Sequence, residues 1–332
     1  MANYSKDKGI NVKTYSSDPP NAYPSAWEGK LYYNSSDGQF KFQTLGTGAW
    51  ASGNNLNATH YASAGGGIQT AAFSVGGQAP GPPYAQDHHE QYNGTSWSEE
   101  ADLNTGRAFY TGTCSGTQTA GLVTAGEKEP WSTKADETET WNGSAWSETG
   151  DVNTARGQLA NCGTTTAALA AGGEDPSGTV AIVESFNGTS WTEVGDMPTG
   201  GKGGSMVGTS TASIYAGSGS APKSLTEVWN GSTWTEGSNL NTDRYYSGGS
   251  GISTLSVTFA GFQGGGPKTA NTEQWDGSSW TEVADLATAR AGGASSSAGT
   301  SITSLFAGGD TGPGAITEEW TTTHTLKKVT TS

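Results

Sequence analysis

The chain has 332 residues, of which 32% are hydrophobic and 14% charged, and its formal net charge is −15. This acidic balance argues against nucleic-acid binding and against an anionic membrane surface, because both need a basic patch and the chain offers only Lys327-Lys328. No apolar run approaches the roughly 18 residues of a transmembrane helix, so we expect no membrane insertion. The 51 glycines would suit disorder, but ten of the 12 tryptophans fall at regular intervals and indicate a folded repeat.

Residues 1–45 carry no copy of that repeat. Met1 to Thr14 lacks the apolar core of a secretion signal, so we expect assembly in a cytoplasm. Asp18-Pro19-Pro20 predicts an extended arm, since a residue before proline is restricted to extended backbone. Residues 28–42 alternate in character around Asp37-Gly38 and predict a β-hairpin.

The repeat itself consists of an aromatic residue, a tight turn, and a tryptophan followed by Ser/Thr and Glu. Five full copies run from Tyr92 to Trp97, Trp141 to Trp146, Phe186 to Trp191, Trp229 to Trp234 and Trp275 to Trp280. A sixth copy is split between Trp320 and Trp50. The spacing of roughly 46 residues is that of a four-stranded propeller blade. We therefore predict six blades, closed by pairing of an N-terminal strand around Trp50 with the strand that ends at Trp320.

One unit, Arg156 to Trp191, shows the expected order of strands. Small residues after Arg156 suit a crowded innermost strand, and Ala167 to Gly173 is an apolar strand that ends in a glycine pair. Val180 to Phe186 is rich in β-branched residues, and Asn187-Gly188 predicts a type I′ turn before the outer strand at Trp191. Because no stretch shows a sustained helical period, the predicted class is all-β.

Two resemblances follow from these motifs. The glycine pair, Glu-x-aromatic, Trp and a short link to Arg resemble the kelch repeat over about Gly46 to Trp320, which implies a kelch-like β-propeller at 46–322 and a C-terminal tail at 323–332. The segment from Gly29 to Phe42 resembles small hairpins of fibre, collar and decoration proteins of tailed bacteriophages. That resemblance implies that residues 1–45 dock on other virion proteins, with several copies per particle.

Recurring and unusual residues give the candidate sites. Arg107, Arg156, Arg244 and Arg290, with His60 in register, are expected around one mouth of the central channel, where guanidinium groups could hold a carboxylate or an acidic sugar. Alternatively, they satisfy backbone carbonyls or the glutamates that precede each first aromatic.

Cys114 and Cys162 are expected as buried thiols on inner strands. Asp87 to Glu90 has metal-binding residue types, but such a tight run seldom gives tetrahedral geometry, so no metal, cofactor or catalytic set is expected.

Specificity is expected in the loops that differ between blades, at 78–87, 127–135, 174–179 and 263–269. Tyr84 and Trp131 are the predicted contact residues, because exposed aromatic faces are typical of binding hot spots and stack on sugars. The predicted function is a non-enzymatic phage virion structural protein, of tail-fibre, neck or collar, or capsid-decoration type, that binds a host surface glycan, a host protein or a neighbouring subunit. The alternative is a carbohydrate-active enzyme or lectin on a propeller scaffold.

Overall fold

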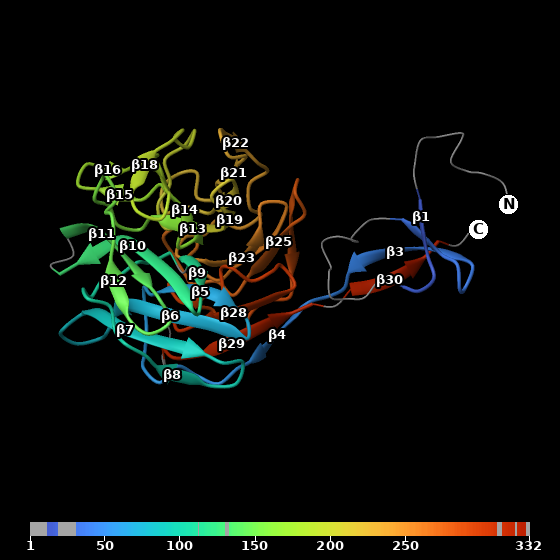
Figure 1. Cartoon of the computed structure of the whole chain (residues 1–332), viewed down its shortest axis with the longest axis horizontal. Helices are drawn as coiled ribbons and strands as arrows, with labels where there is room; N and C mark the ends of the chain where they lie inside the picture. Colours follow the sequence, from blue (N-terminus) through green and yellow to red (C-terminus); the bar gives the residue numbers. More distant parts are fainter. Residues whose placement is uncertain are drawn as a thin grey trace. The chain divides into compact units, whose positions relative to one another are not determined.

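The computed structural model describes residues 12–18, 31–111, 113–129, 133–310, 314–322 and 324–329. Within these ranges every regular element is a β-strand, and none of the segments forms a helix that could cross a membrane. The chain divides into two compact units, one of residues 1–48 with 322–332 and one of residues 49–321 (Figure 1). The second unit contains all six copies of the repeat.

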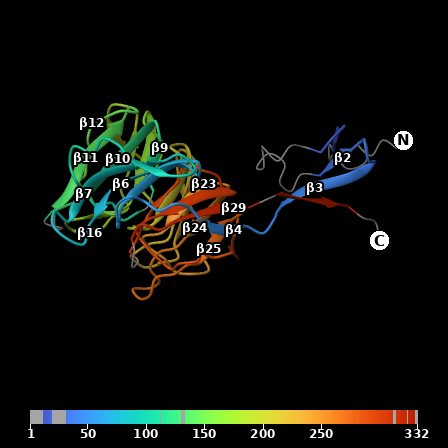
Figure 2. The ribbon, with the colours of Figure 1, turned by 90° about the horizontal axis from the view of Figure 1, so that it is seen from below.

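The smaller unit is a four-stranded sheet in the order β1 (Lys13–Tyr15), β2 (Tyr32–Asn34), β3 (Gln39–Leu45) and β30 (His324–Lys328). β2 and β3 form an antiparallel hairpin around residues 35–38, which confirms the predicted turn, whereas residues 28–30 lie outside the described part. β30 pairs with β3, and Figure 2 shows the two strands side by side. The expectation of a separate tail at 323–332 is therefore wrong for residues 324–328, because the edge of β3 opposite to β2 offers them free backbone groups.

Asp18 is the polar centre of this smaller unit. Its carboxylate accepts hydrogen bonds from Tyr32 Oη at 3.0 Å, Asn34 Nδ2 at 2.6 Å and Lys41 Nζ at 2.9 Å. Burial opposes ionisation of this carboxyl, but the bonds from Lys41, Asn34 and Tyr32 outweigh it and lower the pKa of Asp18. The segment expected as the start of an extended arm is thus tied to the sheet at Asp18.

The larger unit contains six antiparallel four-stranded sheets, named sheets 1 to 6 here. Sheet 1 is β5 (Ala64–Ile68), β6 (Ala71–Gln78), β7 (Ala85–Tyr92) and β8 (Trp97–Glu99); sheet 2 is β9 (Ser115–Thr117), β10 (Ala120–Lys128), β11 (Thr133–Trp141) and β12 (Trp146–Glu148). Sheet 3 is β13 (Ala160–Thr164), β14 (Ala167–Ala171), β17 (Val183–Phe186) and β18 (Trp191–Glu193); sheet 4 is β19 (Ser205–Thr209), β20 (Ala212–Ala216), β21 (Thr226–Trp229) and β22 (Trp234–Glu236). Sheet 5 is β23 (Gly248–Ile252), β24 (Leu255–Phe259), β25 (Thr272–Trp275) and β26 (Trp280–Val283); sheet 6 is β27 (Ala294–Ser295), β28 (Thr303–Ala307), β29 (Thr317–Thr321) and β4 (Ala49–Ser52). A small hairpin of β15 (Glu174–Asp175) and β16 (Gly178–Thr179) extends from sheet 3.

The innermost strands of the six sheets contact one another in the order β5, β9, β13, β19, β23 and β27, and β27 contacts β5. The N-terminal strand β4 is the outer strand of sheet 6, where Trp50 pairs with Trp320. The predicted pairing of these two chain segments is therefore confirmed, and the architecture is all-β and of the β-propeller kind.

The turn before each outer strand differs from the prediction. Phe186 pairs directly with Trp191, so the loop contains four residues rather than the two of a type I′ turn. The Asn187 side-chain oxygen accepts the backbone N–H groups of Thr189 and Ser190, both at 3.0 Å, and Gly188 takes a φ of 97°. Asparagine here closes the loop with its own side chain, and the Thr189 hydroxyl also donates to Asn187 Oδ1 at 2.9 Å, which favours Ser or Thr at this position.

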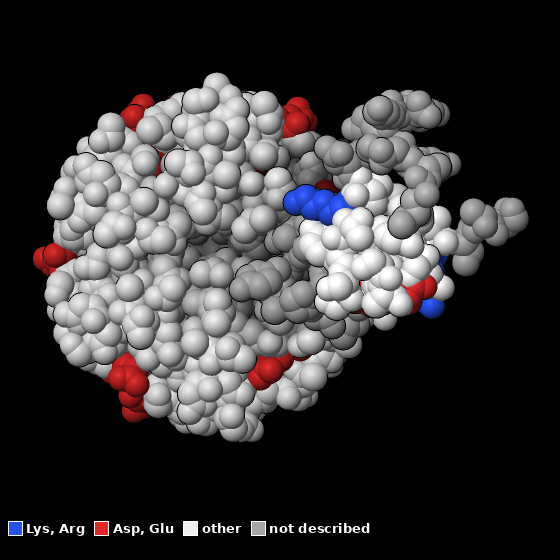
Figure 3. Space-filling view, turned by 45° about the vertical axis from the view of Figure 1, so that its right-hand side comes forward, with Lys and Arg blue, Asp and Glu red and all other residues white. Residues whose placement is uncertain are grey.

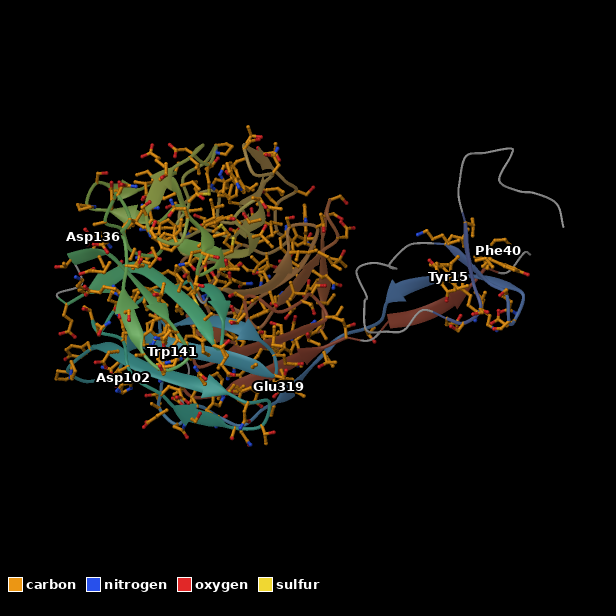
Figure 4. All side chains as sticks on the ribbon, viewed as in Figure 1. Tyr15, Phe40, Asp102, Asp136, Trp141 and Glu319 are labelled. Atoms are coloured by element: carbon orange, nitrogen blue, oxygen red, sulfur yellow. The ribbon has the colours of Figure 1, made fainter. Side chains whose placement is uncertain are left out.

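The outer-strand tryptophans join neighbouring sheets. In five of the six sheets the indole Nε1 group donates to the residue that precedes the recurring glutamate in the preceding sheet. The pairs are Trp50 with Thr272 at 3.0 Å, Trp97 with Thr317 at 3.1 Å, Trp146 with His89 Nδ1 at 3.2 Å, Trp191 with Thr138 at 3.0 Å and Trp280 with Thr226 at 3.0 Å. Trp141 in Figure 4 packs beside one of these, with its ring 5.5 Å from that of Trp146.

Candidate functional site

One face of the larger unit carries both the linkers into the innermost strands and the loops that follow the second strands. Isolated β-bridges fix this arrangement, since Tyr61 pairs with Gln78, Ala108 with Glu127, Gly157 with Glu174 and Tyr245 with Phe262. We call this side of the six sheets the mouth face. The variable loops expected to give specificity leave from the same strand ends, so they lie on this face as well.

The recurring arginines are structural and do not form an open binding ring. All four side chains have 0% exposure, and each meets the recurring glutamate of the sheet that it leads into. The pairs are Arg107 with Glu139 at 2.9 Å, Arg156 with Glu184 at 2.5 Å, Arg244 with Glu273 at 2.6 Å, Arg290 with Glu318 at 3.0 Å and, in register, His60 with Glu90 at 3.2 Å. The binding interpretation of these arginines is therefore wrong, because a fully buried guanidinium committed to a carboxylate cannot receive a ligand.

The same glutamates also anchor the linkers. Asn104 gives its backbone N–H and its side-chain amide to Glu139 Oε2, both at 2.8 Å, and the amide reaches the Trp146 carbonyl oxygen at 3.3 Å. Equivalent bonds recur at Asn57, Asn153 and Asn241. The segment Leu/Val-Asn-Thr-x-Arg thus fastens the linkers that carry it, at 103–107, 152–156 and 240–244, to a buried carboxylate.

Residues with unusual backbone conformations surround the centre of the mouth face. At the start of each innermost segment the chain passes through a left-handed residue. These are Ala62, Tyr110, Gln158, Gly203, Tyr246 and Gly292, with φ values of 57°, 67°, 56°, 68°, 56° and 68°. Bulky residues rarely adopt this conformation, and such positions concentrate at binding sites. The two tyrosines and the glutamine therefore mark the centre of this face as the candidate site.

Their side chains meet there and form what we call the mouth cluster: Tyr61, Tyr110, Gln158, Tyr245, Tyr246 and Phe262. The rings of Tyr110 and Tyr246, from the linkers to sheets 2 and 5, lie 5.0 Å apart, and Tyr61 lies 5.8 Å from Tyr110. Tyr245 stacks on Phe262 at 5.4 Å. Burial raises the pKa of Tyr110 to about 12, so its hydroxyl stays protonated at neutral pH.

Charged groups adjoin the mouth cluster through Gln158. Gln158 accepts a hydrogen bond from Tyr246 Oη at 2.9 Å and donates to Glu127 Oε1 at 3.0 Å. Lys134 contacts Glu127 at 2.6 Å and Glu174 at 3.2 Å, and Lys202 contacts Glu174 at 2.5 Å. Half-buried aromatic faces beside ordered donors and acceptors suit a polar ring such as a sugar.

Of the two predicted contact residues, Tyr84 and Trp131, the structure describes only Tyr84. Tyr84 is 44% exposed and ends the loop after β6, where Ala79 N–H donates to its carbonyl oxygen at 2.9 Å. Trp131 lies outside the described residues. Ala85 N–H donates to Glu129 Oε1 at 2.9 Å, so the loops of sheets 1 and 2 adjoin as expected. Tyr84 therefore lies on the mouth face at its periphery.

The remaining candidates are a histidine-lined hollow and the two thiols. A cavity of about 120 Å³ is bordered by His88, His89, Glu90, Asp102 and their neighbours. Within the described ranges no group of His, Cys, Asp and Glu is arranged to hold a metal ion. Burial lowers the pKa of His89 to about 4, and Trp146 Nε1 donates to its neutral ring at 3.2 Å. Cys114 and Cys162 are free and buried, and burial raises the pKa of Cys162 to about 12.

Charge is distributed unevenly on the larger unit. Figure 3 shows acidic side chains spread around the rim of one face, with uncharged residues between them. Among the described residues, ion pairs near the mouth cluster join Glu127, Lys134, Glu174 and Lys202, and Lys268, which bridges to Phe262, pairs with Asp310 at 3.1 Å. A ligand would thus meet mainly aromatic rings, amides and hydroxyls at the centre of the mouth face.

Comparison with known proteins gives the fold alone. No family model matches the chain, and no curated protein does. Among solved structures, the one described as "Structure of YjhT" is similar with a TM-score of 0.63 and 13% sequence identity. The similarity covers 83% of this chain and 99% of the other. At this identity the resemblance supports the all-β, propeller-like architecture and carries no information on activity.

Proposed function

We propose that this chain is a non-enzymatic structural protein of a tailed-phage virion, a six-bladed kelch-like propeller that binds a saccharide of the host surface at its mouth cluster. The observation that carries the binding role is the set of aromatic residues at the mouth, two of them held in left-handed backbone. Strain of this kind persists only where the surrounding structure enforces it, and it pre-orders side chains for a ligand.

The virion role rests on the smaller unit. Its hairpin carries the Leu31-Tyr32-Tyr33-Asn34 motif, and both ends of the chain join its sheet. Phe40 is 42% exposed on β3, and Tyr33 packs beside it with ring centroids 5.1 Å apart. An exposed aromatic pair on a unit outside the repeat suits docking on a neighbouring virion protein.

Two single substitutions separate the roles. Tyr245→Ala removes an aromatic face from the mouth cluster, so we expect at least a tenfold loss of binding to host cells with normal incorporation into particles. Tyr33→Ala is the matched control in the smaller unit and should lower incorporation while the purified chain still binds cells. Binding that survives Tyr245→Ala at wild-type strength contradicts the mouth assignment, and particles without this chain contradict the virion role.

A further inference from the structure

Sheet 4 lacks the cation that every other sheet places against its buried glutamate. The linker into this sheet reads Met197-Pro198-Thr199-Gly200-Gly201, so Gly201 stands where the other linkers have arginine or histidine, and Pro198 stands where four of them have asparagine. The glutamate itself is retained as Glu227, with 0% exposure. A buried carboxylate has thus lost both its cation and its amide donor.

An aromatic ring lies beside Gly201, at the position where the other linkers carry their cation. Tyr215 lies directly opposite Glu227 on β20 and is fully buried. A Cβ atom at Gly201 would lie only 3.0 Å from the Tyr215 hydroxyl oxygen, so the tyrosine ring fills the space beside the glycine. Gly201 and Tyr215 therefore belong to one local arrangement, in which Tyr215 pairs across the strands with Glu227.

Few polar groups remain to satisfy this carboxyl. Thr199 N–H donates to Glu227 Oε1 at 3.0 Å, and the Thr199 hydroxyl also acts to lower the pKa of this carboxyl. Glu227 Oε2 has no hydrogen-bond partner among the described residues. The charged and titratable groups that face it from its own sheet are Tyr215 on β20 and Glu236, which pairs with it on β22. The cations of the flanking linkers are committed elsewhere, Lys202 to Glu174 at 2.5 Å and Arg244 to Glu273 at 2.6 Å.

We propose that Glu227 is a proton-binding site that controls the stability of sheet 4 near neutral pH. With its proton bound, the neutral carboxyl suits its apolar surroundings; when the proton leaves, sheet 4 holds an uncompensated buried charge. Burial, the largest cause, raises the pKa of Glu227 to about 7 from the ordinary 4.5. The stabilising effect is therefore complete below about pH 4.5 and is lost as the pH rises through 7.

The test compares the unfolding equilibrium of the full chain with that of Glu227→Gln between pH 5 and pH 8. Glutamine keeps the acceptor for Thr199 and cannot lose a proton. We expect the unfolding constant of the wild type, relative to that of Glu227→Gln, to grow on the order of 100-fold over this range. Every other titrating group is common to both proteins and cancels in the ratio. A ratio that stays constant from pH 5 to pH 8 overturns the proposal.

Glu273→Gln is the matched control in sheet 5. It removes a carboxylate that pairs with Arg244, so it should destabilise the chain at every pH and leave its ratio to the wild type constant between pH 6 and pH 8. Hydrogen exchange gives a local measure: β21 amides should exchange faster in the wild type than in Glu227→Gln at pH 8, and equally at pH 5. Equal exchange at both pH values also overturns the proposal.

Discussion

Trp234 differs from the other outer-strand tryptophans in what its indole N–H meets. Its counterparts at 50, 97, 191 and 280 donate to a threonine of the preceding sheet, but the residue at that position in sheet 3 is Val183. Trp234 is 7% exposed, and its Nε1 has no partner among the described residues. One buried donor between sheets 3 and 4 is therefore unsatisfied.

We predict that Val183→Thr stabilises the protein by about 1 kcal/mol, because the hydroxyl supplies the missing acceptor without a change in side-chain shape. Urea denaturation at constant pH measures the effect. The matched control is Val75→Thr, which adds a hydroxyl at an equally buried valine and should destabilise by about 1–3 kcal/mol. If Val183→Thr is as destabilising as the control, the indole N–H is not in need of an acceptor.

Single residues also show where sequence reasoning reaches its limit. The repeat has a glutamate in every unit and an arginine in four, but it left their relation open, since about 30 residues and two strands separate Arg107 from Glu139. Only the register of the sheet brings them together. Tyr110 and Tyr246 were missed because they lie in the variable segment after the arginine. A tyrosine in the sequence does not indicate that its backbone is left-handed.

At the scale of elements, the spacing of the aromatic residues along the chain is more informative about strand pairing than local turn motifs are. Asn187-Gly188 favours a two-residue turn, yet four residues separate Phe186 from Trp191, and pairing of these two aromatics requires the longer loop. The same aromatic spacing correctly gave the pairing of β4 with β29, which are far apart in sequence. The strand β30 was missed because its sequence, His324–Lys328, carries no aromatic or turn signal.

The strand β4 tests that long-range pairing. A chain of residues 44–322 keeps β4, whereas a chain of residues 54–322 lacks it and leaves β29 as an unpaired edge. We predict that the shorter chain loses ~3 kcal/mol or more of its free energy of unfolding, because Trp50 no longer packs on Phe259 and Trp320, and that it aggregates. Thermal unfolding with light scattering distinguishes the two, and identical behaviour of both chains contradicts a structural role for β4.

For the whole molecule, titration of two buried groups, His89 and Glu227, changes the free energy of unfolding in opposite directions. Burial lowers the pKa of His89 to about 4 from 6.5, so its contribution to stability is present above about pH 6.5 and is lost as the pH falls toward 4. Glu227 has the reverse sign, because its pKa is raised to about 7. Between pH 4.5 and pH 6.5 the two contributions change in opposite directions, so their sum should vary little over this range.

A variant that lacks either His89 or Glu227 should show the pH dependence of stability that the other residue causes. His89→Thr introduces the residue that meets the outer-strand tryptophan in four other sheets, so Trp146 keeps an acceptor and the titrating ring is lost. We predict that its free energy of unfolding falls as the pH rises from 4.5 to 7, by at most about 1.4 kcal/mol per pH unit, which is the limit for one proton. Glu227→Gln should show the opposite slope between pH 4 and pH 6.5, and the double variant should show neither. Urea midpoints measured every half pH unit decide this: parallel profiles for the wild type and His89→Thr would mean that the imidazole takes up its proton equally in the folded and unfolded chain.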